Sequence, residues 1–279
     1  MTIRIVTDST SDLPADLARE LGITVVPAYV HFGDEIYRDR VDISEDDFYK
    51  RLLRDPVHPH TEPPSPQDFA GVYKSLSGDA EGIVSIHISS KLSATCNSAT
   101  RGKELSGTKV PIQVVDSQLV TMGLGLLAVT AASCVRSGTT LAQVVEKVKA
   151  TIPGIRMLGL LETLKYLAKG GRMGKAQALL GSMLGVKPML TMKAGELEAS
   201  GRVTTRGQGF EKLTAFVRGT PDIEDLAVVY STEIAEAEAL IAHIVHGLSR
   251  ERIRLVRLGP VLGVHGGPGI LFVALRTKI

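Results

Sequence analysis

The side chains most able to do chemistry gather in a few short segments of the chain. Ser89–Thr95 places several hydroxyls beside a predicted helix N-terminus, where free backbone N–H groups favour anions. Thr61 precedes three prolines, which restrict the backbone and could hold its hydroxyl in place without an ordering cost. His265 lies among the glycines of Gly263–Gly269, where the backbone must turn sharply or approach a neighbour closely. Ser89–Thr95 therefore indicates an anion site, and we expect His265 to point into a cleft.

Each of these segments also has a purely structural interpretation. The hydroxyls and carboxylates of Asp8–Asp12 could contact a ligand, or they could cap the helix that follows. Ser65 and Pro66 are typical of a helix start, so Thr61 could belong to a simple lead-in loop. Gly263–Gly269 could likewise be a tight turn with an incidental histidine. Taken one at a time, the segments leave these alternatives open.

A fifth segment, Lys169–Lys175, looks like a phosphate-binding loop but lacks its spacing. Gly170 and Gly174 are separated by three residues rather than four, and Ala176 stands where a Ser or Thr would hold magnesium. We interpret the segment as a basic turn on a solvated or partner-facing surface. We expect no cofactor.

Composition and the remaining motifs exclude further classes. The net charge is only +2 and no basic stripe is present, so a nucleic-acid binder is not expected. The uncharged stretch Gln118–Val135 is interpreted as a buried core helix, and Cys96 and Cys134 as ordinary buried thiols. With no signal-peptide pattern at the N-terminus, a cytoplasmic protein is expected. The remaining histidines lack the spacing of a metal site, and we expect none at His58, His60, His243 or His246.

Strand-like and helix-like segments alternate along the chain, which predicts an α/β fold. The predicted strands are short apolar runs: Ile3–Thr7, Val25–Phe32, Gly82–His87, Ile112–Asp116, Arg156–Leu160, Ala227–Ser231, Ile253–Arg257 and Gly269–Leu275. The predicted helices are amphipathic or capped: Pro14–Leu21, Ser44–Leu53, Pro66–Leu76, Leu92–Leu105, Met122–Ser137, Leu141–Ala150, Gly174–Leu184, Thr205–Val217 and Glu233–Leu248.

The alternation weakens at Thr151–Gly154, and we place a domain boundary there. The prediction is two α/β domains, residues 1–152 and 153–279, each with a mostly parallel sheet. Parallel sheets bind ligands beyond the carboxyl ends of their strands. The ligand cleft is therefore expected between the two domains.

Taken together, the motifs resemble those of the DegV family, the bacterial fatty-acid-binding proteins that include the binding subunit of fatty acid kinase. The resemblance runs through nearly the whole chain. Six motifs occur in the family's order: IVTDSTSDLP at 5–14, TEPPSP at 61–66, SIHISSKLSATCNSA at 85–99, DSQLVTMGLG at 116–125, ETLKYLAKGGRMG at 162–174 and GPVLGVHGGPG at 259–269. This sequence departs from the family pattern at Ala94, where Gly is usual, and at Cys96, where an aromatic residue is common.

The resemblance implies a long-chain fatty acid held between two α/β domains, with its tail in an apolar tunnel. By motif, Thr61 and Ser93 would bind the carboxylate, with backbone N–H groups beside Ser93 assisting, and His265 would join them. Arg206 lies in a stretch that matches a basic family motif only in part, and it is the further cationic candidate. The implied role is a carrier without catalytic residues, which presents the fatty acid to an ATP-dependent kinase subunit and contacts a membrane surface transiently.

Two points stay open at this stage. Met173–Met192 is uncharged over long parts and rich in Leu, Met and Gly, so it could line the tail, form a membrane-facing lid or belong to the core. An alternative function is acyl-ester hydrolysis with Ser93 as nucleophile and His265 as base. That alternative lacks a nucleophile elbow and an identifiable orienting acid.

Overall fold

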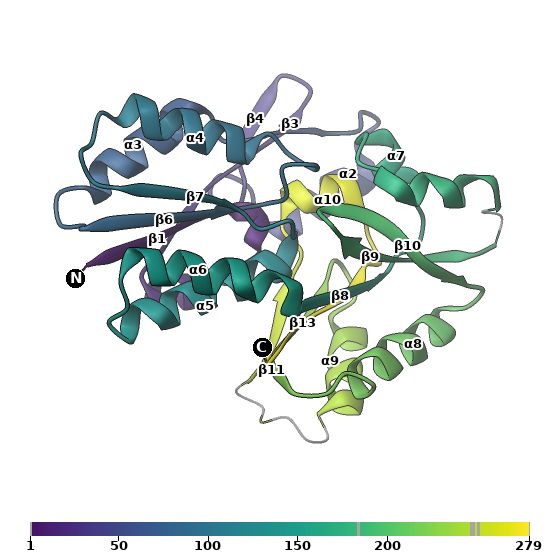
Figure 1. Cartoon of the computed structure of the whole chain (residues 1–279). Helices are drawn as coiled ribbons and strands as arrows, with labels where there is room; N and C mark the ends of the chain where they lie inside the picture. The colour runs from purple at the N-terminus through teal and green to yellow at the C-terminus, as the bar shows by residue number, and fades with distance from the viewer. Residues whose placement is uncertain (1, 183–184, 246–248, 250–251, 279) are drawn as a thin grey trace.

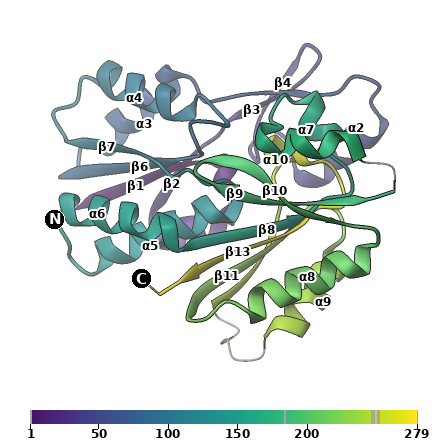
Figure 2. The same cartoon turned by 45° about the vertical axis from the view of Figure 1, so that its right-hand side comes forward.

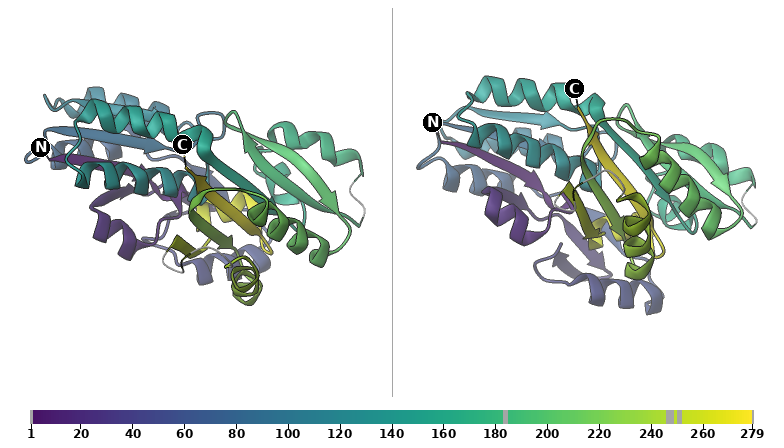
Figure 3. Two further views of the ribbon diagram at one scale, coloured as in Figure 1. Left: turned by 60° about the horizontal axis from the view of Figure 1, so that its bottom comes forward. Right: turned by 90° about the horizontal axis from the view of Figure 1, so that it is seen from below.

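A computed structural model describes residues 2–182, 185–245, 249 and 252–278. Within these residues the chain forms two larger sheets and one small sheet, with helices packed around them (Figure 1). The C-terminal segment returns to the middle of the molecule, between the N-terminal elements and the helices and strands of the second half (Figure 3). The predicted α/β class is confirmed.

The first sheet is parallel throughout, as predicted. Its strands lie in the order β2-β1-β6-β7. They are short and mostly buried: β1 Ile3–Asp8, β2 Ile23–Val26, β6 Gly82–His87 and β7 Ile112–Asp116. The helices α3 (Pro66–Leu76) and α4 (Thr95–Ser106) cover one face, and α5 (Thr121–Arg136) and α6 (Leu141–Thr151) cover the other (Figure 1). The short helix α1 (Ala15–Leu21) joins β1 to β2.

The second sheet corrects the prediction of mostly parallel sheets. Its order is β10-β9-β8-β13-β11-β12, and only β11 and β12 pair in parallel. The strands are β8 Ile155–Leu160, β9 Lys187–Lys193, β10 Glu196–Val203, β11 Ile223–Tyr230, β12 Ile253–Arg257 and β13 Leu271–Thr277. A hairpin through Ala194 and Gly195 joins β9 to β10, and α10 precedes β13 in the chain. Because those connections reverse the strand direction, the sheet is mixed.

Helices on the second half pack mainly on one face of this sheet. α8 (Arg206–Arg218) and α9 (Ile234–Ile244) lie side by side against it (Figure 2). The predicted helix Gly174–Leu184 is instead a 3-10 segment, η3 Gly174–Ser182, and its last two residues lie outside the described part. Two short helices were not predicted, α7 (Lys165–Lys169) and α10 (Pro260–Gly266).

A small antiparallel sheet completes the fold, in the order β4-β3-β5. Its strands are β3 Tyr29–Phe32, β4 Glu35–Arg38 and β5 His60–Glu62, and α2 (Glu45–Arg54) connects β4 to β5. The predicted strand Val25–Phe32 is therefore two strands in two different sheets. The interruption falls at Pro27, which has no N–H to donate to a ladder. Thr61 belongs to β5 rather than to a free loop.

The helix α5 explains why the two larger sheets share a core. It contacts β1 and β6 of the first sheet, and β8, β11 and β13 of the second. Every residue from Thr121 to Ala132 is buried, since each side of the helix meets a sheet. The stretch Gln118–Val135, predicted as a buried core helix, therefore contains most of the buried helix α5. Among the described residues, no helix has the length and apolar character needed to span a bilayer.

The chain passes from the first sheet to the second through the 3-10 turn η2 (Ile152–Gly154). One hydrophobic cluster nevertheless contains residues of both sheets, among them Ile5 and Phe272. The division into two domains at residue 152 stays a prediction.

Candidate functional site

A cavity opens where the three sheets meet, and its walls are mostly aliphatic. It encloses about 910 Å³ of space, including the part open to solvent. The apolar lining comes from all parts of the fold: Ala28, Pro63, Ile88, Leu92, Val120, Leu161, Leu167, Leu190, Leu197, Leu258, Val261, Leu262, Ile270 and Phe272.

Three of the predicted binding residues line this cavity: Thr61, Ser93 and His265. Thr61 Oγ1 lies 2.9 Å from His265 Nε2, although the two residues are 204 positions apart in the chain. Their meeting depends on α10, which carries His265 and packs against β5. The glycine run predicted as a turn is thus the last part of a helix, followed by Gly267 in a backbone conformation with φ of 77°.

Close packing explains two of the glycines around His265. A Cβ on Gly263 would lie 2.4 Å from the ring of Phe48, and one on Gly170 would lie 2.1 Å from His265 Nδ1. Both contacts are too short for a real Cβ, so α10 and the chain after α7 approach their neighbours through glycine. Of the two alternatives that the glycine run left open, close backbone approach is therefore the one present, and residues up to Gly266 form a helix rather than a tight turn.

Ser93 lies just before the N-terminus of α4. Its Oγ lies 2.8 Å from Thr95 Oγ1, and the Thr95 backbone N–H donates to the same oxygen at 3.3 Å. The N-cap position is Ala94, whose side chain cannot accept from the first turn of the helix. The departure from the family's usual Gly at Ala94 keeps this property, since neither residue has a capping side chain. The first turn of α4 is thus suited to an anion at the cavity wall.

Burial keeps the imidazole of His265 neutral. Loss of solvent, with smaller contributions from the positive charges of Arg172 and of His58 when protonated, lowers the pKa of His265 to about 4. Nδ1 is buried and has no hydrogen-bond partner among the described residues. At neutral pH the ring therefore acts as a donor or acceptor without a charge of its own.

Arg172, rather than the predicted Arg206, is the arginine that lines the cavity. It lines the cavity, its Nη1 donates to Gly170 O at 2.7 Å, and its Nε lies 3.4 Å from Leu92 O. Among the described residues it forms no ion pair with a carboxylate. The segment Lys169–Lys175 was interpreted as a solvated or partner-facing turn, so Arg172 was missed. The only signal for Arg172 in the sequence was its place in the family motif at 162–174.

Arg206 does not reach the cavity. It opens α8 and pairs with Glu236, with Nε–Oε1 and Nη2–Oε2 distances of 2.8 and 2.5 Å. It also contacts Glu162 at 3.2 Å and the carbonyl of Gly269. These partners satisfy the guanidinium at the edge of the second sheet. Arg206, predicted as a carboxylate ligand, is thus not among the residues that line the cavity, whereas Arg172 is.

The segment Asp8–Asp12 has mainly a structural role. Asp12 Oδ1 accepts from the Gly259 backbone N–H at 2.9 Å and from Arg40 at 3.1 Å, and its other oxygen accepts from Thr121 at 2.5 Å. Burial raises the pKa of Asp12 to about 7, against the opposing effect of Arg40. Because Gly259 is the N-cap of α10, this carboxyl braces the helix that carries His265. Thr10, in the same segment, lines the cavity.

The stretch Met173–Met192 is divided between two roles. Leu190 lines the cavity, while Ala176 and Met189 are buried in the hydrophobic core. Residues 183–184, within the same stretch, lie outside the described part. The stretch thus contributes to the cavity wall through β9 rather than as one continuous element.

Comparison with known proteins agrees with this geometry. The family model described as "uncharacterised protein, DegV family" matches residues 2–278. A DegV domain-containing protein of Deinococcus radiodurans is 36% identical over 282 residues, which cover 99% of each chain. A Thermus thermophilus DegV family protein with fatty acid binding has a TM-score of 0.91 at 35% identity, over 100% of both chains.

A second solved structure, a stearic-acid-binding protein from Eubacterium ventriosum, has a TM-score of 0.88 at 28% identity. The match covers 99% of this chain and 98% of that one. The fold thus agrees over essentially the whole length of the chain. The chain belongs to the DegV family.

Proposed function

We propose that this protein binds a long-chain fatty acid in the cavity and presents the carboxylate to a separate ATP-dependent fatty acid kinase. The function rests on one feature, an aliphatic cavity wall that also carries hydroxyls, an imidazole and a guanidinium. Thr61 bonds to His265, Arg172 lies beside His265, and Arg172 also reaches the carbonyl of Leu92, next to Ser93. Relatives with the same fold bind fatty acids.

The Thr61 hydroxyl can donate a hydrogen bond to the carboxylate only with one placement of the protons on Thr61 and His265. Thr61 has a single O–H, so it donates to a ligand only if its oxygen accepts from the Nε2–H of His265. The neutral ring that burial enforces has one such N–H to give. Ser93 and the first turn of α4 add donors, and Arg172 adds the charge. Hydrogen bonds to a charged group are the stronger kind, at about 1.5–3 kcal/mol each.

The aliphatic wall supplies the larger share of the affinity. A tail of ~15 methylenes at ~0.8 kcal/mol each contributes ~12 kcal/mol gross. Association costs of ~4 kcal/mol or more leave about 8 kcal/mol, which corresponds to a dissociation constant of about 1 μM before the head group contributes. The head group then brings the affinity below micromolar.

The carrier role requires no catalytic residue in this chain. The alternative, a hydrolase with Ser93 and His265, finds little support in the contacts. Ser93 Oγ pairs with Thr95 and His265 Nε2 pairs with Thr61. Nδ1 of His265 has no acid to orient it among the described residues. The kinase partner and the transient membrane contact rest on the family resemblance, and the cytoplasmic location rests on the N-terminal sequence pattern.

Mass spectrometry of lipid extracted from the purified protein tests the ligand. We expect one acyl chain per protein, and delipidated protein should rebind oleate. The variant Thr61→Ala with Ser93→Ala should lose at least about tenfold in oleate affinity, equivalent to ~1.4 kcal/mol, but keep its affinity for the matching fatty alcohol. Ser75→Ala with Thr100→Ala, which removes two exposed hydroxyls, is the matched control.

The kinase role has its own measurement. ATP-dependent acyl phosphate, trapped with hydroxylamine, should form only when carrier and kinase are mixed, and the double variant should reduce it. Wild-type rates with that variant would contradict the head-group assignment. Hydrolysis of p-nitrophenyl esters that disappears in Ser93→Ala would favour the hydrolase.

A further inference from the structure

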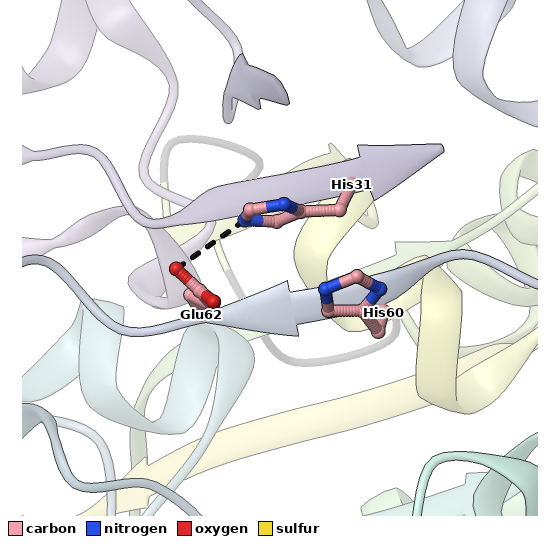
Figure 4. Close-up of side chains that lie close together, drawn as sticks. All are labelled: His31, His60 and Glu62. Carbon is pink, nitrogen blue, oxygen red and sulfur yellow. Dashed lines mark ion pairs between the residues drawn. The ribbon is translucent and has the colours of Figure 1, made fainter. Parts of the chain in front are cut away.

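Two histidines and a glutamate gather on the small sheet, apart from the polar group around Thr61 and His265. His31 of β3 lies opposite His60 of β5 in the antiparallel register, and Glu62 follows two residues after His60 on the same strand face (Figure 4). Their ligand atoms all lie within 4.8 Å of one another. The two imidazole rings are stacked, with centroids 4.4 Å apart.

An ordinary hydrogen bond does not explain this cluster. The His31 side chain is only 10% exposed, and its Nε2 faces Glu62 Oε2 at 3.4 Å without meeting hydrogen-bond geometry (Figure 4). A buried ring nitrogen without a partner is costly, by the desolvation of a polar group. Imidazole nitrogens and a carboxylate oxygen gathered this closely are donors that a metal ion can use.

We propose that His31, His60 and Glu62 bind a divalent transition-metal ion, with zinc as the best match to the donor set. Two imidazoles and a carboxylate are a common protein ligand set for zinc, with water in the fourth position. Bond lengths of roughly 2.0–2.1 Å in a tetrahedron place ligand atoms about 3.4 Å apart. His31 Nε2 and Glu62 Oε2 already have this separation. His60 is exposed, so its ring is free to move toward the other two.

The position of the site connects it to the cavity. Side chains alternate along β5, so His60 and Glu62 lie on one face of the strand and Thr61 on the other. Glu62 also borders the cavity. A metal bridge from β5 to His31 of β3 thus holds the strand that carries Thr61.

The sequence offered little sign of this site. The spacing of His58 and His60 predicted no metal site. His58 packs beside Tyr166, with ring centroids 5.9 Å apart. The true partner of His60 is His31, 29 positions earlier, and only the pairing of β3 with β5 brings them together.

Titration of the whole delipidated protein with Zn²⁺ in a calorimeter tests the proposal, with Co²⁺ as a spectroscopic probe of tetrahedral coordination. We expect one equivalent of Zn²⁺ to bind and the visible absorption of Co²⁺ to intensify. His60→Ala and Glu62→Gln should each weaken Zn²⁺ binding at least about tenfold. Both side chains are exposed, so folding should be preserved, and circular dichroism checks it.

His243→Ala is the matched control, since that exposed histidine lies on α9, far along the chain from the small sheet. It should bind Zn²⁺ as wild type does. His31→Ala should abolish binding if it folds. Absence of stoichiometric binding by wild type, or unchanged binding in His60→Ala and Glu62→Gln, overturns the site.

Discussion

Among the described residues, two pairs of a hydroxyl and an imidazole occur in opposite surroundings. On β6, Ser85 Oγ lies 2.7 Å from His87 Nε2, and Asp8 Oδ2 lies 2.9 Å from His87 Nδ1. All three side chains are fully buried in the first sheet. At the cavity, Thr61 Oγ1 and His265 Nε2 are 2.9 Å apart, and the other ring nitrogen has no partner among the described residues.

The first pair has the connectivity of a catalytic triad but no access to substrate. Tyr73 donates to Ser85, and Asp8 also accepts from the backbone of Ile88 and Thr10, so every group is used within the core. The second pair has access to the cavity but no orienting acid. This difference shows that a pattern of hydrogen bonds alone does not identify a reactive site, because a reaction also needs space for the substrate. Here the buried network holds the fold and the open pair is available to a ligand.

The largest expected effect comes from breaking the buried network. Asp8→Ala leaves several buried donors without an acceptor, among them the Ile88 and Thr10 backbone N–H groups and His87 Nδ1. At ~1–3 kcal/mol for each, the free energy of unfolding should fall by roughly 3 kcal/mol or more. Urea unfolding measures it. Thr61→Val, at the open pair, should lose less than about 1 kcal/mol, and equal losses would remove the distinction.

A smaller effect, on oleate affinity, is expected to distinguish Arg172 from Arg206. Arg172→Gln should weaken oleate binding about tenfold, since a charge-assisted hydrogen bond to the carboxylate is lost. Arg206→Gln should stay within about twofold, because Arg206 is already paired with Glu236 outside the cavity. Isothermal titration with oleate checks both variants. A larger loss for Arg206→Gln would restore the original sequence-based assignment.

The smallest expected effect is a change in the pKa of His265 when a ligand binds. Without ligand, His265 should become protonated only as the pH falls to about 4. A bound carboxylate favours the protonated ring and raises its pKa, while a bound fatty alcohol adds the same desolvation without the charge. The NMR midpoint of His265 should therefore be higher with the fatty acid than with the alcohol.

Much of the local structure was predictable from the chain. The bounds of β6, β7, β12 and α3 match the predictions, because each has a clear apolar run or a capped start. The helix α3 begins with the predicted Ser65 cap and Pro66. Four strands, β4, β5, β9 and β10, were missed, since prolines, polar residues and mixed periodicity conceal them. Val25–Phe32 looked continuous, although Pro27 divides it between two sheets.

The sequence by itself determined the parallel first sheet, the family, and three polar side chains that line the cavity. Those features depend on short motifs and on local patterns of burial, which a linear chain displays directly. Only the tertiary structure decided that the second sheet is mixed, that Arg172 and not Arg206 lies at the cavity, and that His31 meets His60. Each of these features depends on contacts between segments that are distant in the sequence. Local periodicity does not encode such contacts.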